Sequence, residues 1–248
     1  MLTPEERKRY DRQLMMDGFG EAGQERLKQA KVLVAGMGGL GSPVAFYLAA
    51  AGIGTLCLID SDVVDLSNLN RQILHWTPDL GRRKVDSAEK KLKELNPGIE
   101  IEAVCKTITA DNVMELTAGF DIIVDAMDNL PARFLLNRAA IAHRIPFFHG
   151  AVNGLEGRVM TIIPGESACL RCLYRGPIRQ EKFPVVGVTP AVVGCIQATE
   201  VLKFIVKTGR LLTNRMVVYD GLNLEFTEFR LQKNSACDHC GQVEPSKP

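Results

Sequence analysis

The stretch KVLVAGMGGLGSPVAFYLAAAGIGTLCLID, residues 31–60, decides the fold. An apolar run at 31–35 leads through a glycine-rich turn at 36–41 into an apolar segment that ends near residue 51, and a second apolar run follows at 55–60. This order predicts a strand, a helix and a second strand. Because a unit of this length joins parallel neighbours through a right-handed crossover, it predicts a doubly wound sheet.

The alternation of helix and strand continues along the chain and then changes. The predicted parallel half goes on with helix 82–95, strand 99–104, helix 109–118, strand 120–126, helix 131–143 and strand 146–151. Later strands are predicted at 158–163, 216–219 and 224–231, with a long helix at 190–208. Strand 158–163 follows its predecessor through a short glycine-rich link, and a tight Asp-Gly turn joins strands 216–219 and 224–231. Links this short can join only antiparallel strands. The fold class is therefore α/β: a Rossmann-like sheet that is parallel in its N-terminal half and antiparallel in its C-terminal half.

The ends of the chain extend this single domain. Residues 3–30 are charged and interrupted by glycines, which predicts an arm of two short helices joined by a turn. We expect one domain over 1–248, with an N-terminal arm at 1–30, a nucleotide-binding half at 31–156, a mixed-sheet half at 157–241 and a disordered tail at 242–248.

Composition excludes several classes of protein. Hydrophobic residues make up 46% of the chain and charged residues 24%, as in ordinary soluble globular proteins. A net charge of +1 gives no global field for nucleic acid or an anionic membrane. The N-terminus lacks the apolar run of a signal peptide, and no uninterrupted apolar run reaches the ~18 residues of a membrane span. We expect a cytoplasmic protein.

The glycine turn predicts a nucleotide site. Gly36, Gly38, Gly39 and Gly41 leave room for backbone N–H groups and a helix N-terminus to approach an anion. Asp60 follows Gly41 by 19 residues, a position from which a carboxylate accepts hydrogen bonds from ribose hydroxyls. These features alone admit a dinucleotide as well as ATP.

Three charged residues favour ATP over a dinucleotide. Attack at the α-phosphorus of a triphosphate requires cations, which Arg71 and Lys84 can supply, and a carboxylate for Mg²⁺, which Asp128 can supply. Taken singly, each has a simpler interpretation: a solvated loop charge, an early-turn surface residue and a helix cap, respectively. Only the combination indicates a triphosphate site.

The cysteines form a second pattern. Four of the seven lie in two Cys-x-x-Cys pairs, Cys169 with Cys172 and Cys237 with Cys240, separated by 64 residues. This spacing predicts one structural Zn²⁺ site, the alternative being chance clustering. Among the remaining thiols, Cys57 and Cys105 are expected in the core, and Cys195 in an apolar helix that raises its pKa. His75 and His149 could border the nucleotide site, but packing roles are favoured for both.

At these motifs the sequence resembles the ThiF/MoeB/HesA family, bacterial relatives of ubiquitin-activating enzymes. The resemblance runs from Arg9 to Gln242. Its matching stretches are residues 9–14, 36–42, 60–62, 67–72, 81–84 and 128–129, together with the two cysteine pairs.

The resemblance implies roles for individual residues. It places Gly39 at the phosphates, Asp60 at the ribose and Asp128 at the metal. Arg12 would reach the phosphates of a neighbouring subunit, which implies a homodimer. The implied nucleotide site comprises Gly36, Gly38, Gly39, Gly41, Asp60, Asp62, Ser67, Asn68, Asn70, Arg71, Gln72, Lys84, Asp128 and Asn129, with Arg12, Arg71, Lys84 and Asp128 closest to the chemistry.

The resemblance also implies a reaction. The family uses ATP to adenylate the terminal glycine of a ubiquitin-like, β-grasp sulfur-carrier protein that ends in Gly-Gly, and releases pyrophosphate. Some relatives carry a further cysteine in the loop after the first Cys pair, but residues 174–189 contain none. We therefore expect the reaction to stop at the acyl-adenylate, with sulfur delivered by an external donor. Two alternatives stay open: adenylation of a carboxylate on a modified tRNA base, and NAD binding by an oxidoreductase or a silent module.

Overall fold

A computed structural model describes residues 1–175 and 183–245, and its centre is one eight-stranded mixed sheet. The order across the sheet is β3-β2-β1-β4-β5-β6-β7-β8. The first five strands in that order are parallel to one another, and the pairs β5–β6, β6–β7 and β7–β8 are antiparallel, which confirms the predicted fold class. The strands are β1 (Lys31–Ala35), β2 (Thr55–Ile59), β3 (Glu100–Val104), β4 (Ile122–Asp125), β5 (Phe147–Asn153), β6 (Glu156–Ile162), β7 (Arg215–Asp220) and β8 (Glu225–Arg230).

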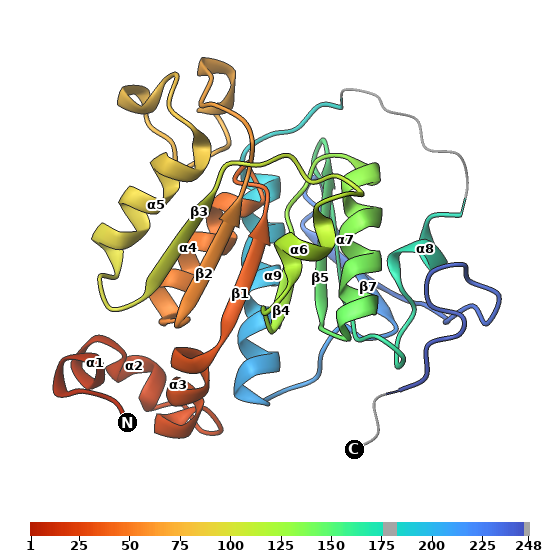
Figure 1. The fold of residues 1–248 in the computed structure, drawn as a ribbon, viewed down its shortest axis with the longest axis horizontal. Coiled ribbons are helices and arrows are strands. Elements are labelled where there is room, and N and C mark those ends of the chain that lie inside the picture. The colour runs from red at the N-terminus through yellow and green to blue at the C-terminus, as the bar shows by residue number, and fades with distance from the viewer. Residues whose placement is uncertain (176–182, 246–248) are drawn as a thin grey trace.

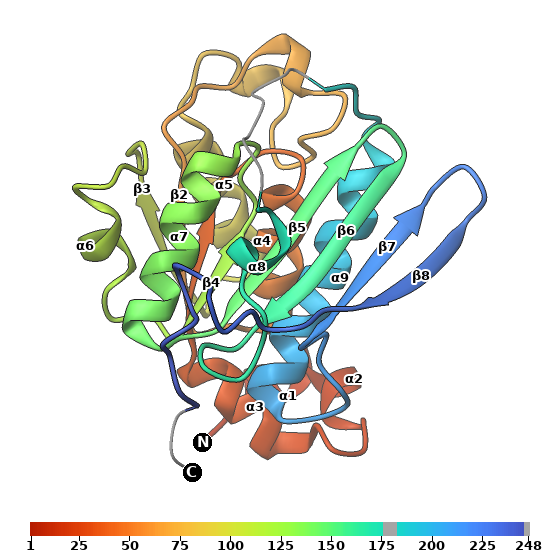
Figure 2. The same cartoon turned by 90° about the vertical axis from the view of Figure 1, so that its right-hand side faces the viewer.

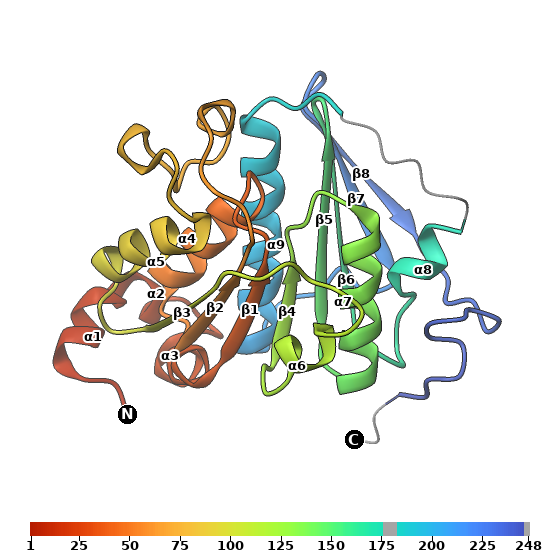
Figure 3. The same cartoon turned by 45° about the horizontal axis from the view of Figure 1, so that its top comes forward.

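Helices cover both faces of the sheet (Figures 1 and 3). One face packs against α3 (Gly20–Gln29), α4 (Gly41–Ala51), α5 (Lys84–Leu95) and α9 (Val188–Val206). The other packs against α6 (Val113–Thr117), α7 (Leu130–His143) and α8 (Leu170–Leu173). The strand β1 shows the cause: Val32 and Val34 enter the first core, while Leu33 and Ala35 enter the second. A strand apolar on both sides requires cover on both sides.

The β7–β8 hairpin departs from this pattern. All six residues of β8 are exposed, and the hairpin extends from the sheet as a two-stranded ribbon (Figure 2). Leu222 and Leu224 at its tip and Phe226 and Phe229 on β8 are exposed apolar side chains. The core therefore reaches β7, where Met216 is buried, but leaves β8 uncovered.

The N-terminal arm contains three helices, so the expected pair was wrong. They are α1 (Pro4–Arg9), α2 (Asp11–Leu14) and α3. A capping box between Thr3 and Glu6 starts α1, and Tyr10, with φ −99° and ψ 13°, separates it from α2. Gly18 and Gly20 adopt positive φ and separate α2 from α3. A one-residue interruption leaves too weak a signal in the sequence to divide the first helix.

The helix expected at 109–118 is also shorter than predicted. The Asn112 side chain accepts from the Thr109 N–H at 2.9 Å and donates to the Thr107 carbonyl at 2.9 Å. These bonds fold the preceding residues into a turn, because an Asn side chain competes with helical backbone bonds. Only Val113–Thr117 remains helical.

The helix α9 is long and apolar enough to cross a membrane by length and composition alone, the one such helix among the described residues. It packs against α4, β5 and β6, and 44% of its apolar window is buried within the protein. These contacts are those of a core helix. The tail expected to be disordered, 242–248, lies partly outside the described residues, since the structure ends at Pro245. The loop after the first Cys pair also lies partly outside, at 176–182.

Candidate functional site

The turn between β1 and α4 can be built only with glycine at two positions. Gly36 has φ +97°, and a Cβ there would lie 2.6 Å from the Ala126 carbonyl oxygen. A Cβ at Gly41 would lie 1.8 Å from the Gly36 carbonyl oxygen. The turn after β1 therefore packs directly against the backbone that follows β4. This is the point where strand order reverses, and ligands of doubly wound sheets bind at that edge.

The backbone of the turn leaves N–H groups free for a ligand. The N–H of Gly36 donates to the Ile59 carbonyl at 2.7 Å, and that of Met37 donates to Asp60 Oδ2 at 2.7 Å. Within residues 1–175 and 183–245, no acceptor takes the N–H of Gly38, Gly39 or Leu40. Three free N–H groups just before α4 make an anion cradle.

Asp60 does more than the sequence indicated. Its Oδ2 holds the Met37 N–H, and its Oδ1 accepts from the Asp62 N–H at 2.8 Å. Each carboxylate oxygen can accept a further bond, so a ribose hydroxyl can still be held there. The carboxylate thus fixes the turn and can still accept a hydroxyl group.

Lys84 is buried at the start of α5. Its Nζ lies 2.8 Å from Asp62 Oδ2, and its backbone N–H donates to the Asp62 carbonyl at 2.9 Å. The interpretation of Lys84 as an ordinary surface residue is therefore wrong. The helix places an ammonium group next to the segment that follows β2, at the same edge as the glycine turn.

The loop that carries Arg71 lies against the glycine turn. A Cβ at Gly38 would be 3.6 Å from Gln72 Nε2, and one at Gly39 would be 3.5 Å from the Arg71 carbonyl oxygen. The guanidinium of Arg71 donates to the Ser67 carbonyl at 2.8 Å and to Asn70 Oδ1 at 3.3 Å. Asn68 belongs to a short 3-10 helix, η1 (Leu66–Asn68), and its carbonyl accepts from the Arg71 N–H. Ser67, Asn68 and Asn70 thus hold Arg71 through hydrogen bonds, and Gln72 lies beside Gly38.

Asp128 follows β4 on the other side of the turn. The helix cap proposed for it is supplied instead by Asn129, whose Oδ1 accepts from the Ala132 N–H at 3.0 Å. Among the described residues, the Asp128 carboxylate has one side-chain contact, from Asn129 Nδ2 at 3.4 Å, and it is exposed. Its oxygens therefore remain available to a cation at the edge where Gly36 meets Ala126.

Two histidines at this edge have contacts that sequence analysis missed. His75 Nε2 lies 2.9 Å from the Met37 carbonyl oxygen in the glycine turn. His149 Nδ1 lies 2.6 Å from Asp125 Oδ2, and burial lowers the pKa of His149. The Nε2 of His149 has no hydrogen-bond partner among the described residues. In the sequence, only their positions indicated a place near the site: His75 follows the Arg71 loop, and His149 lies in β5.

Arg12 is not brought to this site. It is exposed on α2, and within the described ranges it forms no ion pair. The helices α1 and α2 lie at the end of the molecule opposite the loops that follow the parallel strands (Figure 1). A role for Arg12 in phosphate binding would therefore require a second copy of the chain.

The four paired cysteines lie together. The Sγ atoms of Cys169, Cys172, Cys237 and Cys240 are all within 4.8 Å of one another and all four residues are buried. The separations are 3.7 Å between Cys169 and Cys237 and 3.5 Å between Cys172 and Cys240. A tetrahedral ion with Zn–S bonds of about 2.3 Å separates its sulfurs by about 3.8 Å, so the cluster fits Zn²⁺.

Three thiols of the cluster differ in acidity. Burial raises the pKa of Cys169 and raises that of Cys240 to about 11, whereas the pKa of Cys172 is lowered, against the effect of burial, by hydrogen bonds that include one from the Asn234 backbone N–H. Binding of a cation through Cys169 and Cys240 would require both to lose their protons. Elsewhere, burial raises the pKa of Cys57 to about 12 and also raises that of Cys195. These last two shifts agree with unreactive thiols, as expected.

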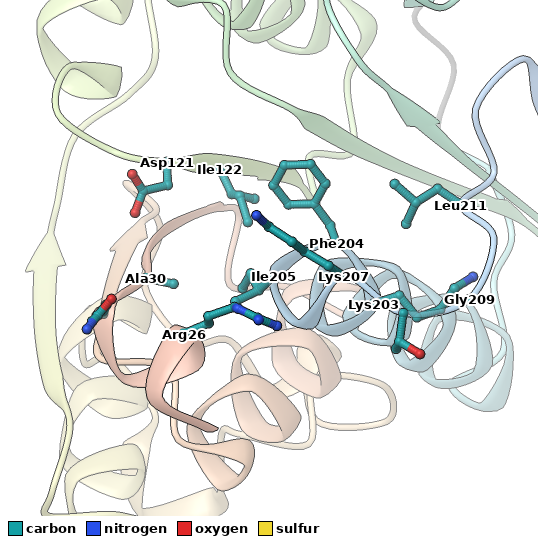
Figure 4. Close-up of a pocket in the computed structure, with 12 residues that line it drawn as sticks. Arg26, Ala30, Asp121, Ile122, Lys203, Phe204, Ile205, Lys207, Gly209 and Leu211 are labelled. Atoms are coloured by element: carbon teal, nitrogen blue, oxygen red, sulfur yellow. The ribbon is translucent and has the colours of Figure 1, made fainter. Parts of the chain in front are cut away.

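A cavity of about 670 Å³ lies at the opposite edge of the sheet, between α3 and the end of α9 (Figure 4). Ala30, which precedes β1, and Ile122, which starts β4, mark it as the amino-terminal edge. Two of its cations have partners: Arg26 donates to the Val206 carbonyl at 2.7 Å and Lys203 to the Arg210 carbonyl at 2.6 Å. This cavity is separate from the edge that carries the glycine turn.

Comparison with known proteins agrees with the geometry. The ThiF family pattern matches residues 10–239. The SAMP-activating enzyme E1 of Haloferax volcanii is 41% identical over 240 residues, covering 94% of this chain and 88% of that protein. The sulfur carrier protein adenylyltransferase of Thermus thermophilus is 40% identical, covering 99% of this chain and 94% of that protein.

A solved structure shows the same fold at lower identity. A crystal structure of MccB from E. coli has a TM-score of 0.85 at 23% identity, covering 95% of this chain and 75% of that chain. The likeness extends over both the parallel and the antiparallel halves of the sheet. With a family match over nearly the whole length and two relatives above 30% identity, this chain belongs to the ThiF family.

Proposed function

We propose that this protein is an adenylyltransferase that uses ATP to activate the C-terminal glycine carboxylate of a ubiquitin-like sulfur-carrier protein. The observation that supports this most directly is the anion cradle of Gly38, Gly39 and Leu40, flanked by Lys84, the Arg71 loop and Asp128. The names of the two relatives support the same activity. The protein is thus proposed to work on a protein carboxylate rather than on a redox substrate.

The proposed step requires no protein nucleophile. A carboxylate oxygen of the carrier attacks the α-phosphorus, the new P–O bond forms, and the bond to the bridging oxygen breaks to release pyrophosphate. The backbone N–H groups and the charges of Lys84 and Arg71 stabilise the charge that develops on the phosphates. Bound Mg²⁺ would add further charge neutralisation, and Asp128 would hold it together with the phosphates. Positioning and electrostatics therefore supply the catalysis.

The remaining assignments complete the proposal. We assign a structural Zn²⁺ to the four cysteines, a homodimer in which Arg12 reaches the neighbouring site, an external sulfur donor and a cytoplasmic location. The domain is proposed as a single unit with its arm, two halves and tail as given above. The distance of α2 from its own glycine turn supports the assignment of Arg12 to a second subunit (Figure 1).

Exchange of labelled pyrophosphate into ATP tests the proposal. With a β-grasp carrier ending in Gly-Gly, exchange should depend on the intact carrier and disappear when its last glycine is removed. Asp128→Ala should abolish exchange and keep the wild-type melting temperature, while Glu115→Gln, an exposed acid on α6, serves as the matched control. Exchange that proceeds without any carrier, or wild-type rates for Asp128→Ala, would refute it. Tight NAD binding with no ATP binding would instead select the oxidoreductase alternative.

A further inference from the structure

A buried chain of hydrogen bonds ends on the glycine turn. Lys91 Nζ donates to Ser87 Oγ at 2.9 Å, Ser87 Oγ lies 3.0 Å from His75 Nδ1, and His75 Nε2 lies 2.9 Å from the Met37 carbonyl oxygen. Lys91 also pairs with Asp79. The four side chains that form these bonds are all buried, at 9% exposure or less: Lys91, Ser87, His75 and Asp79.

Chemistry fixes the direction of each bond. The Met37 carbonyl can only accept, so His75 Nε2 must carry a hydrogen. Burial lowers the pKa of His75, with the charges of Lys91 and Lys84 acting in the same direction, so the ring is neutral and its Nδ1 is an acceptor. Ser87 therefore donates to Nδ1, and Lys91 donates to Ser87. Each donor in this series of hydrogen bonds therefore points toward the glycine turn.

The hydrogen bond between His75 and the Met37 carbonyl also orients the Gly38 N–H. In a trans peptide the carbonyl and the following N–H point in opposite directions, and the described residues contain no cis peptide. Holding the Met37 carbonyl inward against His75 therefore directs the Gly38 N–H outward. Asp60 Oδ2 holds the N–H of Met37 itself at 2.7 Å. The two polar groups of Met37 are thus fixed from two sides.

We propose that His75 is a positioning residue of the nucleotide site. It fixes the Met37–Gly38 peptide so that the Gly38 N–H faces the phosphates, and through Ser87 it ties the glycine turn to α5, the helix that begins with Lys84. This inference rests on the proposed function only in taking ATP as the ligand of the turn. The cradle and the Lys84 ammonium group thus keep a constant relative position before ATP binds. This lowers the entropic cost of ordering them when ATP binds.

Two substitutions separate positioning from packing. In His75→Gln the amide nitrogen takes the place of Nε2 and can still donate to Met37, whereas His75→Asn reaches only the Nδ1 position and can contact Ser87 alone. We expect ATP to bind within about threefold of wild type in the Gln variant and at least about tenfold more weakly in the Asn variant. Calorimetric titration with ATP gives both values, and thermal unfolding shows the stability of each. A purely structural role would affect ATP binding equally in both, so equal affinities overturn the inference.

The variant Ser87→Ala gives a second test that does not depend on changing His75. Ser87→Ala removes the donor to Nδ1 with little change in volume, and it should weaken ATP binding and raise KM for ATP while KM for the carrier stays constant. Unchanged ATP affinity in Ser87→Ala would count against the proposal, even where the histidine variants fail to fold. His143→Gln, remote on α7, is the matched control. If the wild-type protein fails to bind ATP, the proposed function falls, whereas a wild type that binds ATP with equal Gln and Asn variants removes the His75 inference alone.

Discussion

The ammonium group of Lys84 lies 2.8 Å from Asp62 Oδ2, and the two side chains differ widely in exposure, at 6% and 66%. The lysine is thus held by a carboxylate that itself faces solvent. An ammonium has three donors, so this pair leaves others for a phosphate. Asp62 is therefore placed to fix the position of the Lys84 ammonium group.

Substitutions of Lys84 and Asp62 should lower the rate of carrier-dependent pyrophosphate exchange to different extents. Lys84→Ala should lower the rate by roughly 100-fold or more, because one preorganised donor to the developing charge is lost. Asp62→Ala should lower it by about tenfold, and Asp62→Asn by less, since an amide oxygen still accepts from Lys84. Lys90→Ala, exposed on the same helix, is the control. A rate for Asp62→Ala above that of wild type would mean that Asp62 restrains Lys84 instead.

Gly38 and Gly41 should respond differently to the same change. A Cβ at Gly38 meets nothing closer than Gln72 Nε2 at 3.6 Å, so Gly38→Ala should keep its fold and melting temperature. It should nevertheless bind ATP about tenfold or more weakly, because the methyl group occupies the approach of a phosphate. Gly41→Ala places a Cβ 1.8 Å from the Gly36 carbonyl oxygen and should unfold or fail to express. Full ATP affinity in a folded Gly38→Ala variant would show that the cradle binds no phosphate.

Removal of one cysteine of the cluster should destabilise the protein without changing the edge that carries the glycine turn. Cys172→Ala should bind no zinc and melt roughly 5–10 °C lower, because the proposed ion would tie α8 to the C-terminal segment. Metal analysis and thermal unfolding measure both effects. Cys105→Ala, which removes a thiol outside the cluster, should retain zinc and wild-type stability. One zinc per chain in Cys172→Ala would contradict a four-cysteine site.

The free energy of unfolding should fall as the pH drops through about 6.5. Burial lowers the pKa of His149, and the charges of Arg133 and Arg158 add to this, while Asp125 opposes it. The unfolded chain therefore binds a proton that the native ring resists, so stability present above about pH 6.5 is lost below it, by at most about 1.4 kcal/mol per pH unit for one proton.

The variant His149→Asn isolates this contribution. Its amide nitrogen can replace Nδ1 as the donor to Asp125, but it does not titrate, so urea unfolding at pH 7.5 and 5.5 should differ less than in wild type. The Tyr174 ring also packs edge-on against the imidazole, with 6.2 Å between the ring centroids. An unchanged difference between the two pH values would assign the acid loss to other groups.

Local patterns predicted most of the fold because they depend on neighbours in the chain. The run 31–60 has the strand, turn and helix lengths that admit only a parallel unit, and the short links before β6 and β8 admit only antiparallel pairing. Errors arose where a single residue decides the outcome. Tyr10 divides the arm, and the Asn112 side chain shortens α6.

The sequence by itself determined the glycine turn, the order of strands and helices along the chain, and the two cysteine pairs. Each of these is set by spacing within a short segment. Only the tertiary structure decided which side chains meet: Lys84 with Asp62, His75 with Met37, and Asn129 rather than Asp128 as the cap of α7. The first two pairs join residues 22 and 38 positions apart. Such contacts depend on how α5 and the loop before it pack on the sheet, and no local pattern encodes that packing.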